Sequence, residues 1–407
     1  MSSPDRTVGA LRGEGGHILE PLVRRFLAHI ETGDLTLDLP SGARLIHKGA
    51  RSGPQAFLTI HRWRAIWRLI LLGDVGFAES YIRGDWSSRD LPTFIELAAR
   101  NIEPLEAKIS GSFAARLAAR LRHLANANTR IGSRKNIAFH YDLGNSFYEC
   151  WLDPSMSYSS ALYAVSFDTL EDAQARKIKR IEELLDINGN SEVLEIGCGW
   201  GALAIALARR CRSVRGVTLS AEQRAFANSR VGESGLAGKV AFELRDYRDI
   251  TGSFDRIVSI EMVEAVGEAF WPNYFQALHD RLRPGGVVLL QAITIDESRF
   301  DSYRQSPDFI QRHVFPGGML PTREAIVREA EKVGLVFSFS ERFGESYART
   351  LAEWRRRFLA SRKQVEAMGF SEQFQRMWDY YLSYSEGAFR AGVIDVGFYG
   401  FRRPAAR

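Results

Sequence analysis

Residues 193–201 read VLEIGCGWG, and this stretch decides the fold of the chain. An apolar strand reaches an acidic residue and turns through three glycines into an apolar helical pattern, Ala202 to Arg210. Glycines let the backbone approach a ligand closely, and the start of a helix offers unpaired N–H groups. The pattern is G-x-G-x-G, which differs from the dinucleotide pattern G-x-G-x-x-G with a ribose-binding acid about 20 residues later. The stretch therefore indicates a ligand-binding turn between a strand and a helix.

This turn resembles motif I of the class I methyltransferases, which bind S-adenosylmethionine. The segments that follow have the order expected for such a domain. They are a second strand at 214–220, an acidic segment at 244–247, a third strand at 254–259, and a helix end, turn and strand at 282–290. Strands and helices alternate to about Leu335, which predicts an α/β fold with a doubly wound parallel sheet. The ligand is expected at the carboxyl ends of the strands.

Composition sets broad limits on the function. The chain has 407 residues, which is enough for two domains, and 45% hydrophobic and 25% charged residues, as in ordinary globular proteins. No apolar run approaches the roughly 20 residues of a membrane span, so we expect a soluble, cytoplasmic protein. The three cysteines lack metal-ligand spacing and indicate neither a disulfide framework nor a metal site. The net charge of +5 permits nucleic acid or anionic lipid as a partner.

The sequence predicts three regions. Residues 1–111 mix strand and helix patterns and predict a small α+β domain, with strands at 34–40 and 56–60, an apolar segment with arginines at 63–72 that ends at Gly73, and a helical pattern at 76–86. Residues 112–135 predict a basic helical linker. Residues 136–407 predict the methyltransferase domain, with a helical insertion rich in Trp, Phe, Tyr and Arg at 351–390, before a last strand at 397–401.

The basic linker has two interpretations, and the residues leave both open. Apolar side chains recur at helical spacing beside a series of basic ones: Phe113, Leu117, Leu121 and Leu124, with Arg116, Arg120, Arg122, Arg130, Arg134 and Lys135. Such a helix can lie on an anionic membrane surface. Alternatively, it connects the two domains and keeps its arginines in water.

Several further segments are more specific than a general methyltransferase pattern. They are HYDLGNSFY at 140–148, LDPSMSYS at 152–159, EMVEAVG at 261–267, FPGGMLP at 315–321, YARTL at 347–351 and EGAFR at 386–390. Together they look like the cyclopropane-fatty-acyl-phospholipid synthase family, including its bacterial N-terminal domain. The resemblance covers nearly the whole chain and is strongest from Asn136 to Arg390.

The resemblance implies transfer of the methyl group of S-adenosylmethionine to a cis double bond of a phospholipid acyl chain, which gives a cyclopropane. An alkene is a weak nucleophile, so the sulfonium must be held in line in a dry cavity. Aromatic faces can stabilise the resulting carbocation. A base must then remove a proton, and in this family that base is taken to be bound bicarbonate. The implied partner is an unsaturated phospholipid, met by peripheral association with the inner membrane. No nucleic-acid partner is expected, and a homodimer is allowed.

The resemblance also carries over a binding site for S-adenosylmethionine, residue by residue. Tyr158 and Ser159 match contacts to the methionine end, and Gly197, Gly199 and Gly201 match the glycine turn. Thr218, Leu219 and Gln223 match the ribose region, and Asp246 and Tyr247 are expected beside the adenine. Each of these residues has a structural interpretation when taken alone, for example Thr218 as a helix N-cap.

The bicarbonate pocket carries over only in part. Glu264, Tyr347 and the backbone of Ile293 match family ligands. Ser160 stands where the family has a cysteine, and Gln291 where it has a histidine. Both can donate hydrogen bonds to an oxyanion, but neither can become cationic, so the pocket loses a potential positive charge.

Three alternatives remain beside ring formation. If the proton leaves a neighbouring chain carbon, the product is a methyl-branched unsaturated chain. A small-molecule or nucleic-acid methyltransferase fits the basic charge, but the sequence has no base-methylation motif or RNA-binding module. A scaffold that binds S-adenosylmethionine without turnover is disfavoured by the retained Glu264 and Tyr347.

Overall fold

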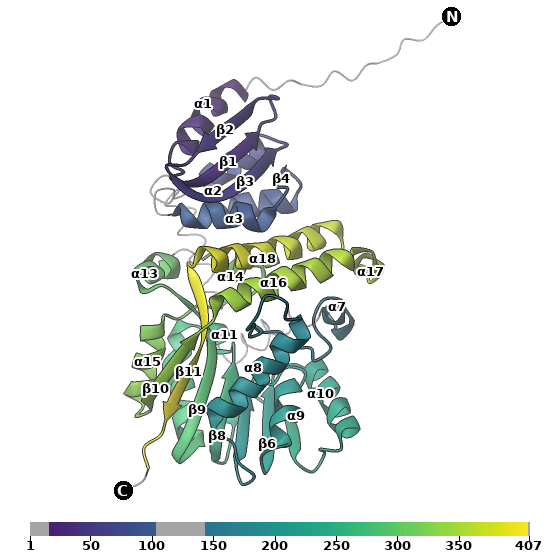
Figure 1. Ribbon diagram of the computed structural model, residues 1–407, viewed down its shortest axis with the longest axis vertical. Helices are drawn as coiled ribbons and strands as arrows, with labels where there is room; N and C mark the ends of the chain where they lie inside the picture. The colour runs from purple at the N-terminus through teal and green to yellow at the C-terminus, as the bar shows by residue number, and fades with distance from the viewer. Residues whose placement is uncertain (1–15, 103–142, 306, 406–407) are drawn as a thin grey trace, which may run out of the picture. The chain divides into compact units, whose positions relative to one another are not determined.

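The computed structural model describes residues 16–102, 143–305 and 307–405 (Figure 1). The chain divides into two compact units, residues 1–111 and 112–407. The basic linker expected at 112–135 lies outside the described residues. Within the described ranges, none of the helices combines the length and apolarity that crossing a bilayer would require.

The first unit is built on a four-stranded sheet with the order β2-β1-β3-β4. β1 runs parallel to β3 and antiparallel to β2, and β4 pairs antiparallel with β3. Every second residue of β1 is buried, as its alternating sequence predicts, and the predicted strands 34–40 and 56–60 correspond to β1 and β3. The elements are α1 (Gly16–Leu27), β1 (Thr32–Asp38), β2 (Arg44–Lys48), β3 (Arg51–Ile60), α2 (Arg64–Ile82), β4 (Trp86–Ser87) and α3 (Leu91–Arg100).

Helix α2 is kinked at Gly73, where the sequence pattern predicted its end. The backbone of Gly73 has φ 68° and ψ −152°, a conformation that a residue with a side chain rarely adopts, and the helix then resumes. Large apolar side chains around the kink are exposed, with 48% of Trp67 and 55% of Leu71 accessible to solvent. The first unit therefore presents an apolar surface on α2.

The second unit contains a seven-stranded sheet with the order β10-β11-β9-β8-β5-β6-β7. The strands from β9 to β7 pair in parallel, which confirms the predicted α/β fold. The sheet is mostly parallel, since β11 is antiparallel to both β9 and β10. The strands are β5 (Glu192–Ile196), β6 (Ser213–Thr218), β7 (Val240–Leu244), β8 (Phe254–Ile260), β9 (Leu282–Ile295), β10 (Val336–Arg342) and β11 (Ile394–Arg402).

Helices pack on both faces of this sheet and bury two apolar cores. One core joins the sheet to α8 (Leu170–Leu185), α9 (Ala202–Ala208) and α10 (Ala221–Ser234). The other joins it to α12 (Trp271–Arg281) and α15 (Arg323–Lys332). Burial on both faces explains why β9 contains the continuous apolar run 287–290. The remaining helical elements are α7 (Asn145–Glu149), η1 (Tyr247–Asp249), α11 (Val263–Val266), η2 (Glu268–Phe270), α13 (Glu297–Gln305) and α14 (Phe309–His313).

The helical insertion consists of α16 (Gly344–Ala360), α17 (Arg362–Ala367) and α18 (Glu372–Ala391). It begins at Gly344, seven positions before the predicted start at Leu351. Helices α16 and α18 pack side by side, above the sheet in the view of Figure 1. Tyr347 of α16 contacts Glu261 at the carboxyl end of β8, and Tyr381 of α18 contacts Tyr158, so the insertion lies at the edge where the ligand is expected.

Candidate active site

The glycine turn follows β5 and needs all three glycines, for different reasons. Gly197, Gly199 and Gly201 all have positive φ, at 83°, 49° and 87°. A Cβ at Gly201 would lie 2.7 Å from Phe242 Cζ, and one at Gly197 would lie 2.4 Å from Met262. At Gly199 no described atom lies within 4 Å of an added Cβ. Gly201 therefore permits packing within the protein, whereas Gly199 leaves open space for a ligand.

A pocket opens at the carboxyl ends of β5, β6 and β8, beside this turn. Most of the residues predicted to bind S-adenosylmethionine line it: Tyr158, Ser159, Gly197, Gly199, Thr218, Leu219, Gln223 and Tyr247. These residues come from four separate segments of the chain, which the fold brings to one edge of the sheet.

Two of the predicted residues, Gly201 and Asp246, lie outside the pocket wall formed by the described residues. The Asp246 carboxylate is buried and accepts hydrogen bonds from the backbone N–H and the guanidinium of Arg248, at 2.6–3.0 Å. This pair fixes the start of η1, the turn that carries Tyr247. Asp246 therefore has a clear structural task, and its contact with adenine stays a prediction.

Thr218 orients Gln223 at the end of β6. The hydroxyl of Thr218 donates to Gln223 Oε1 at 2.8 Å and accepts from the backbone N–H of Ser220 at 3.1 Å. Ser220 in turn caps α10 by accepting from the backbone N–H of Gln223. All three side chains are buried, so their positions are fixed by the protein before any ligand binds.

Two buried titratable residues in the pocket wall, Glu195 and Lys177, were not among the site residues predicted from the sequence. Burial raises the pKa of Glu195 to about 8, and its Oε2 has no hydrogen-bond partner among the described residues. Burial lowers the pKa of Lys177 to about 8, and its ammonium donates to Ser159 Oγ at 2.7 Å. Glu195 was visible as the acid before the glycine turn. Lys177 shares a buried helical stripe with Ala173 and Ile181, which was the available signal.

A further carboxylate, Glu261, occupies the centre of the predicted catalytic residues. It accepts hydrogen bonds from the backbone N–H of Ser160 at 2.9 Å and from Gln291 Nε2 at 2.8 Å, both on Oε1. The hydroxyl of Tyr347 donates to its Oε2 at 2.7 Å. Sequence reasoning quoted Glu261 as part of a motif but gave it no role.

These contacts test whether the pocket fits bicarbonate. Two groups expected around that anion, the amide of Gln291 and the hydroxyl of Tyr347, already donate to Glu261, and so does the backbone N–H of Ser160. The Ser160 hydroxyl donates instead to the carbonyl of Ala161, at 2.9 Å. A second anion here would face the Glu261 carboxylate in a buried site, so these residues do not fit bicarbonate.

Glu264 and the backbone of Ile293, which were predicted as separate ligands of the anion, contact each other beside Glu261. The backbone N–H of Ile293 donates to Glu264 Oε1 at 2.5 Å, and Glu264 Oε2 has no partner among the described residues. Burial, together with the nearby charge of Glu261, raises the pKa of Glu264 to about 8. The raised pKa favours the protonated form of Glu264, whereas the three hydrogen bonds donated to Glu261 favour its ionised form.

Aromatic rings from three helices enclose Tyr158. The centroid of its ring lies 5.4 Å from those of Trp151 and Trp354 and 5.5 Å from that of Tyr148. Its hydroxyl pairs with that of Tyr381 on α18 at 2.8 Å. These contacts build a wall of packed aromatic rings beside the pocket, and Tyr148, Trp151 and Trp354 are fully buried in it.

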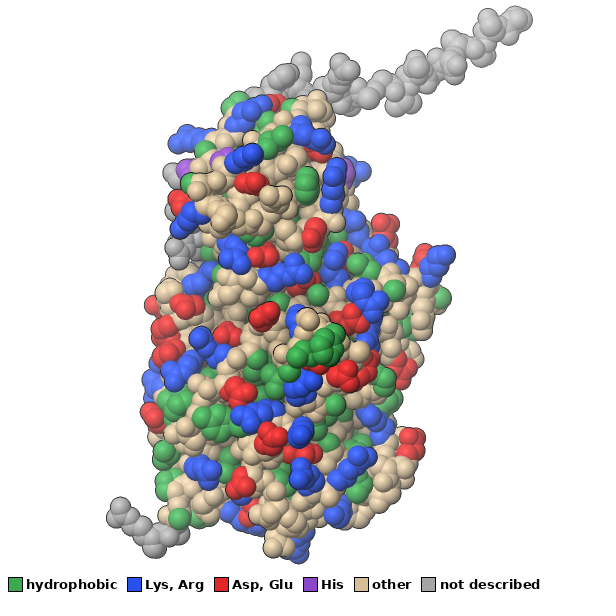
Figure 2. Space-filling model, in the orientation of Figure 1, with side chains coloured by type: hydrophobic (Ala, Val, Ile, Leu, Met, Phe, Trp, Pro, Cys, Tyr) green, Lys and Arg blue, Asp and Glu red, His purple; other side chains and the backbone are tan. Residues whose placement is uncertain are grey.

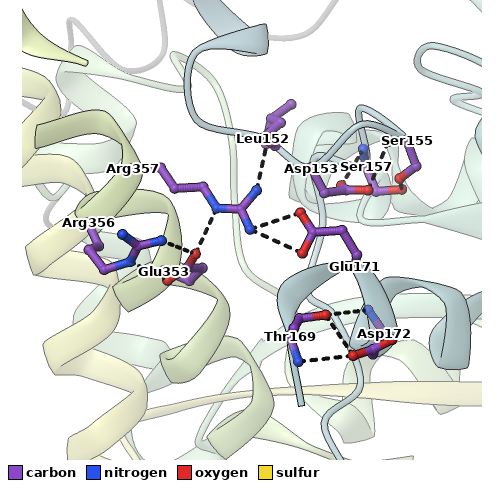
Figure 3. A network of polar contacts seen from close by, with 10 residues as sticks. All are labelled: Leu152, Asp153, Ser155, Ser157, Thr169, Glu171, Asp172, Glu353, Arg356 and Arg357. Atoms are coloured by element: carbon purple, nitrogen blue, oxygen red, sulfur yellow. Dashed lines mark hydrogen bonds and ion pairs between the residues drawn. The ribbon is translucent and has the colours of Figure 1, made fainter. Parts of the chain in front are cut away.

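A polar network fastens the insertion to the loop that carries Tyr158 (Figure 3). Arg357 of α16 donates to the carboxylate of Glu171 on α8 at 2.9 and 3.2 Å and to the carbonyl of Leu152 at 3.4 Å. The carboxylate of Asp153, the next residue, accepts from two backbone N–H groups and folds the loop toward Tyr158. The network therefore holds together α16, α8 and the loop at 152–157, which leads to Tyr158.

Comparison with known proteins identifies the family of this chain. Residues 128–398 match the family model described as mycolic acid cyclopropane synthetase. The chain belongs to this family. It is 38% identical over 397 residues to the tuberculostearic acid methyltransferase UfaA1 of Mycobacterium tuberculosis, covering 95% of this chain and 91% of that protein. It is also 38% identical over 330 residues to the cyclopropane-fatty-acyl-phospholipid synthase of Escherichia coli, covering 81% and 83%.

A solved structure supports the same assignment. Mycolic acid cyclopropane synthase CmaA1, complexed with SAH and CTAB, superposes with a TM-score of 0.62 and 30% identity, over 66% of this chain and 98% of that chain. The predicted family is thus confirmed, and this member is an S-adenosylmethionine-dependent methyltransferase of the cyclopropane-synthase type. The pocket fits S-adenosylmethionine, since Gly199 leaves space open and the buried Glu195 has an oxygen free for a ligand.

Proposed function

We propose that this enzyme transfers the methyl group of S-adenosylmethionine to a cis double bond of an unsaturated phospholipid acyl chain and closes a cyclopropane ring. One observation carries the proposal: two partly buried and electrostatically coupled carboxyl groups, Glu261 and Glu264, lie at the end of β8, and Glu261 lines the glycine-turn pocket. Glu261 belongs to the pocket wall itself, and the ring of Tyr347, its hydrogen-bond donor, contacts Trp354.

Each part of the site answers a need of this chemistry. S-adenosylmethionine supplies an electrophilic methyl group, and the glycine turn with Thr218, Gln223 and Tyr158 would hold it. The aromatic wall excludes water and offers ring faces to positive charge that develops on the acyl chain. A neighbouring carboxylate can then accept a proton, which ends the reaction.

A methyl-branched unsaturated chain is the second candidate product. The relative that aligns over 95% of this chain bears the name tuberculostearic acid methyltransferase, which refers to methylation and not to a ring. The two products differ only in which proton leaves: one from the new methyl group closes the ring, and one from an adjacent chain carbon leaves an alkene.

Labelling separates the two products. We would express the chain in a bacterium that lacks its own cyclopropane synthase, feed methionine with a trideuterated methyl group, and analyse the fatty acids by mass spectrometry. Ring closure retains two deuterium atoms and gives a product that mild hydrogenation leaves unchanged. Proton loss from the chain retains three and gives a product that takes up hydrogen. The same host without the gene is the control, and absence of any labelled acyl chain would refute the proposed function.

We also propose that the enzyme reaches its lipid by peripheral association with the inner membrane, from the cytoplasmic side. The exposed apolar side chains on α2, Trp67, Ile70, Leu71 and Leu72, support this. Acidic and basic side chains are mixed on the face of the second unit in Figure 2. The proposal of membrane association therefore rests on the apolar side chains of α2 and not on a positively charged surface. A homodimer remains a prediction, which analytical ultracentrifugation would test.

A further inference from the structure

The backbone at Glu261 is held in an unusual conformation directly after β8. Its φ is 51°, in the left-handed region that residues with a side chain rarely occupy. Its backbone N–H donates to the carbonyl of Gln291 at 2.7 Å, which ties it to β9. Strain of this kind persists where the surrounding structure fixes it, and it clusters at functional sites. Here it aims a carboxylate into the pocket.

The hydrogen bonds around Glu261 match the ionised carboxylate. The backbone N–H of Ser160, the amide of Gln291 and the hydroxyl of Tyr347 all donate to it. Burial keeps the pKa of Tyr347 well above its ordinary value, so this hydroxyl stays a donor. The ammonium of Lys177 adds an attractive charge from the same pocket. Burial nevertheless raises the pKa of Glu261, which makes its carboxylate a better base than one in water.

We propose that the Glu261 carboxylate itself is the base that removes the proton after methyl transfer, in the place that the family gives to bicarbonate. This inference rests on the proposed function. It makes the enzyme independent of bicarbonate, because the donors that would bind the anion already hold a side chain.

The step balances in atoms and charge. The π electrons of the alkene form the new carbon–carbon bond to the methyl group as the sulfur–methyl bond breaks, and the sulfur keeps that electron pair. The adjacent chain carbon becomes a carbocation. A Glu261 oxygen then takes a proton, from the new methyl group or from a chain carbon. The released C–H electrons close the ring or form the double bond, and Glu261 ends as a neutral acid.

Anion binding tests the proposal without any lipid turnover. We would titrate bicarbonate into protein saturated with S-adenosylhomocysteine and follow the heat of binding, for wild type and for Glu261→Gly. The wild type is expected to give no binding at millimolar bicarbonate. Glu261→Gly removes the carboxylate, suits the positive φ, and is expected to bind the anion. Binding by the wild type would overturn the proposal.

Turnover provides the second test. Glu261→Gln keeps the shape of the side chain and is expected to lower turnover by about 10²-fold or more, with affinity for S-adenosylhomocysteine changed by less than about threefold. Added bicarbonate or formate should restore part of the activity to Glu261→Gly but not to Glu261→Gln, whose side chain still fills the site. Glu297→Gln, at an exposed glutamate of α13, is the matched control and should leave turnover unchanged.

The outcomes separate this inference from the proposed function. A wild type that needs bicarbonate for turnover, or a Glu261→Gln variant with normal turnover, refutes the role of Glu261 while methyl transfer stands. A wild type that methylates no acyl chain refutes the proposed function, and the bicarbonate titration then still decides whether Glu261 fills the anion site.

Discussion

Two glycines of the same turn should fail in opposite ways when each is changed to alanine. Gly201 and Gly199 both have positive φ, at 87° and 49°, so each variant bears a similar backbone penalty of about 1–2 kcal/mol. They differ in what the new methyl group meets. At Gly201 it would lie 2.7 Å from Phe242 Cζ and 2.9 Å from Ala227 Cβ, and at Gly199 no described atom lies within 4 Å.

The magnitudes follow from these contacts. Overpacking a buried site costs about 1–3 kcal/mol, so Gly201→Ala should be less stable than Gly199→Ala by that amount. For a domain of this size that difference lowers the melting temperature by a further few degrees, about 2–4 °C per kcal/mol. Gly199→Ala instead places its methyl group in the ligand's space and should weaken binding of S-adenosylhomocysteine by roughly 5- to 150-fold.

Thermal unfolding and titration calorimetry, run on the same preparations, measure both effects. Gly201→Ala should melt at a lower temperature but bind with nearly wild-type affinity while folded, and each variant serves as the control for the other. Equal melting temperatures would show that the contact with Phe242 is easily relieved. Unchanged affinity in Gly199→Ala would refute the assignment of this turn to S-adenosylmethionine.

Three other predictions follow from the geometry. Arg357→Met should destabilise the protein by about 1–3 kcal/mol because it leaves a partly buried network unpaired, whereas Arg356→Met, at a side chain that is 68% exposed, should change stability by less than about 0.5 kcal/mol in denaturant unfolding. Because the pKa of Glu264 is raised from its ordinary value of 4.5 to about 8, the folded protein loses stability as the pH rises between these two values. The free energy of unfolding of Glu264→Gln should therefore depend less on pH in this range than that of the wild type. Equal pH dependence in the two proteins would contradict the raised pKa. Trp67→Ser with Leu71→Ser should weaken sedimentation with anionic liposomes, and wild-type binding should fall with added salt; equal binding to neutral vesicles at all salt concentrations would exclude an electrostatic contribution.

The sequence determined the parts of this protein that depend on neighbours along the chain. An apolar strand, an acid and three glycines predict a strand, a turn and a helix, because the conformations involved are set within a few residues. The family resemblance then named Thr218, Gln223 and Tyr247 beside Gly199, and these residues line one pocket. The alternation at 34–40 likewise predicted a half-buried strand, and every second residue of β1 is buried.

Only the tertiary structure decided the catalytic arrangement. Glu261 lies 101 positions along the chain from Ser160 and 86 from Tyr347. The sequence pattern around one residue cannot predict hydrogen bonds to residues so far away in the chain. The burial that shifts the pKa of Lys177 and of Glu264 arises where helices and strands from distant segments exclude water together. Family resemblance named most of the residues around an expected anion. The packing of β8, β9 and α16 determined that a carboxylate of the protein itself receives their hydrogen bonds.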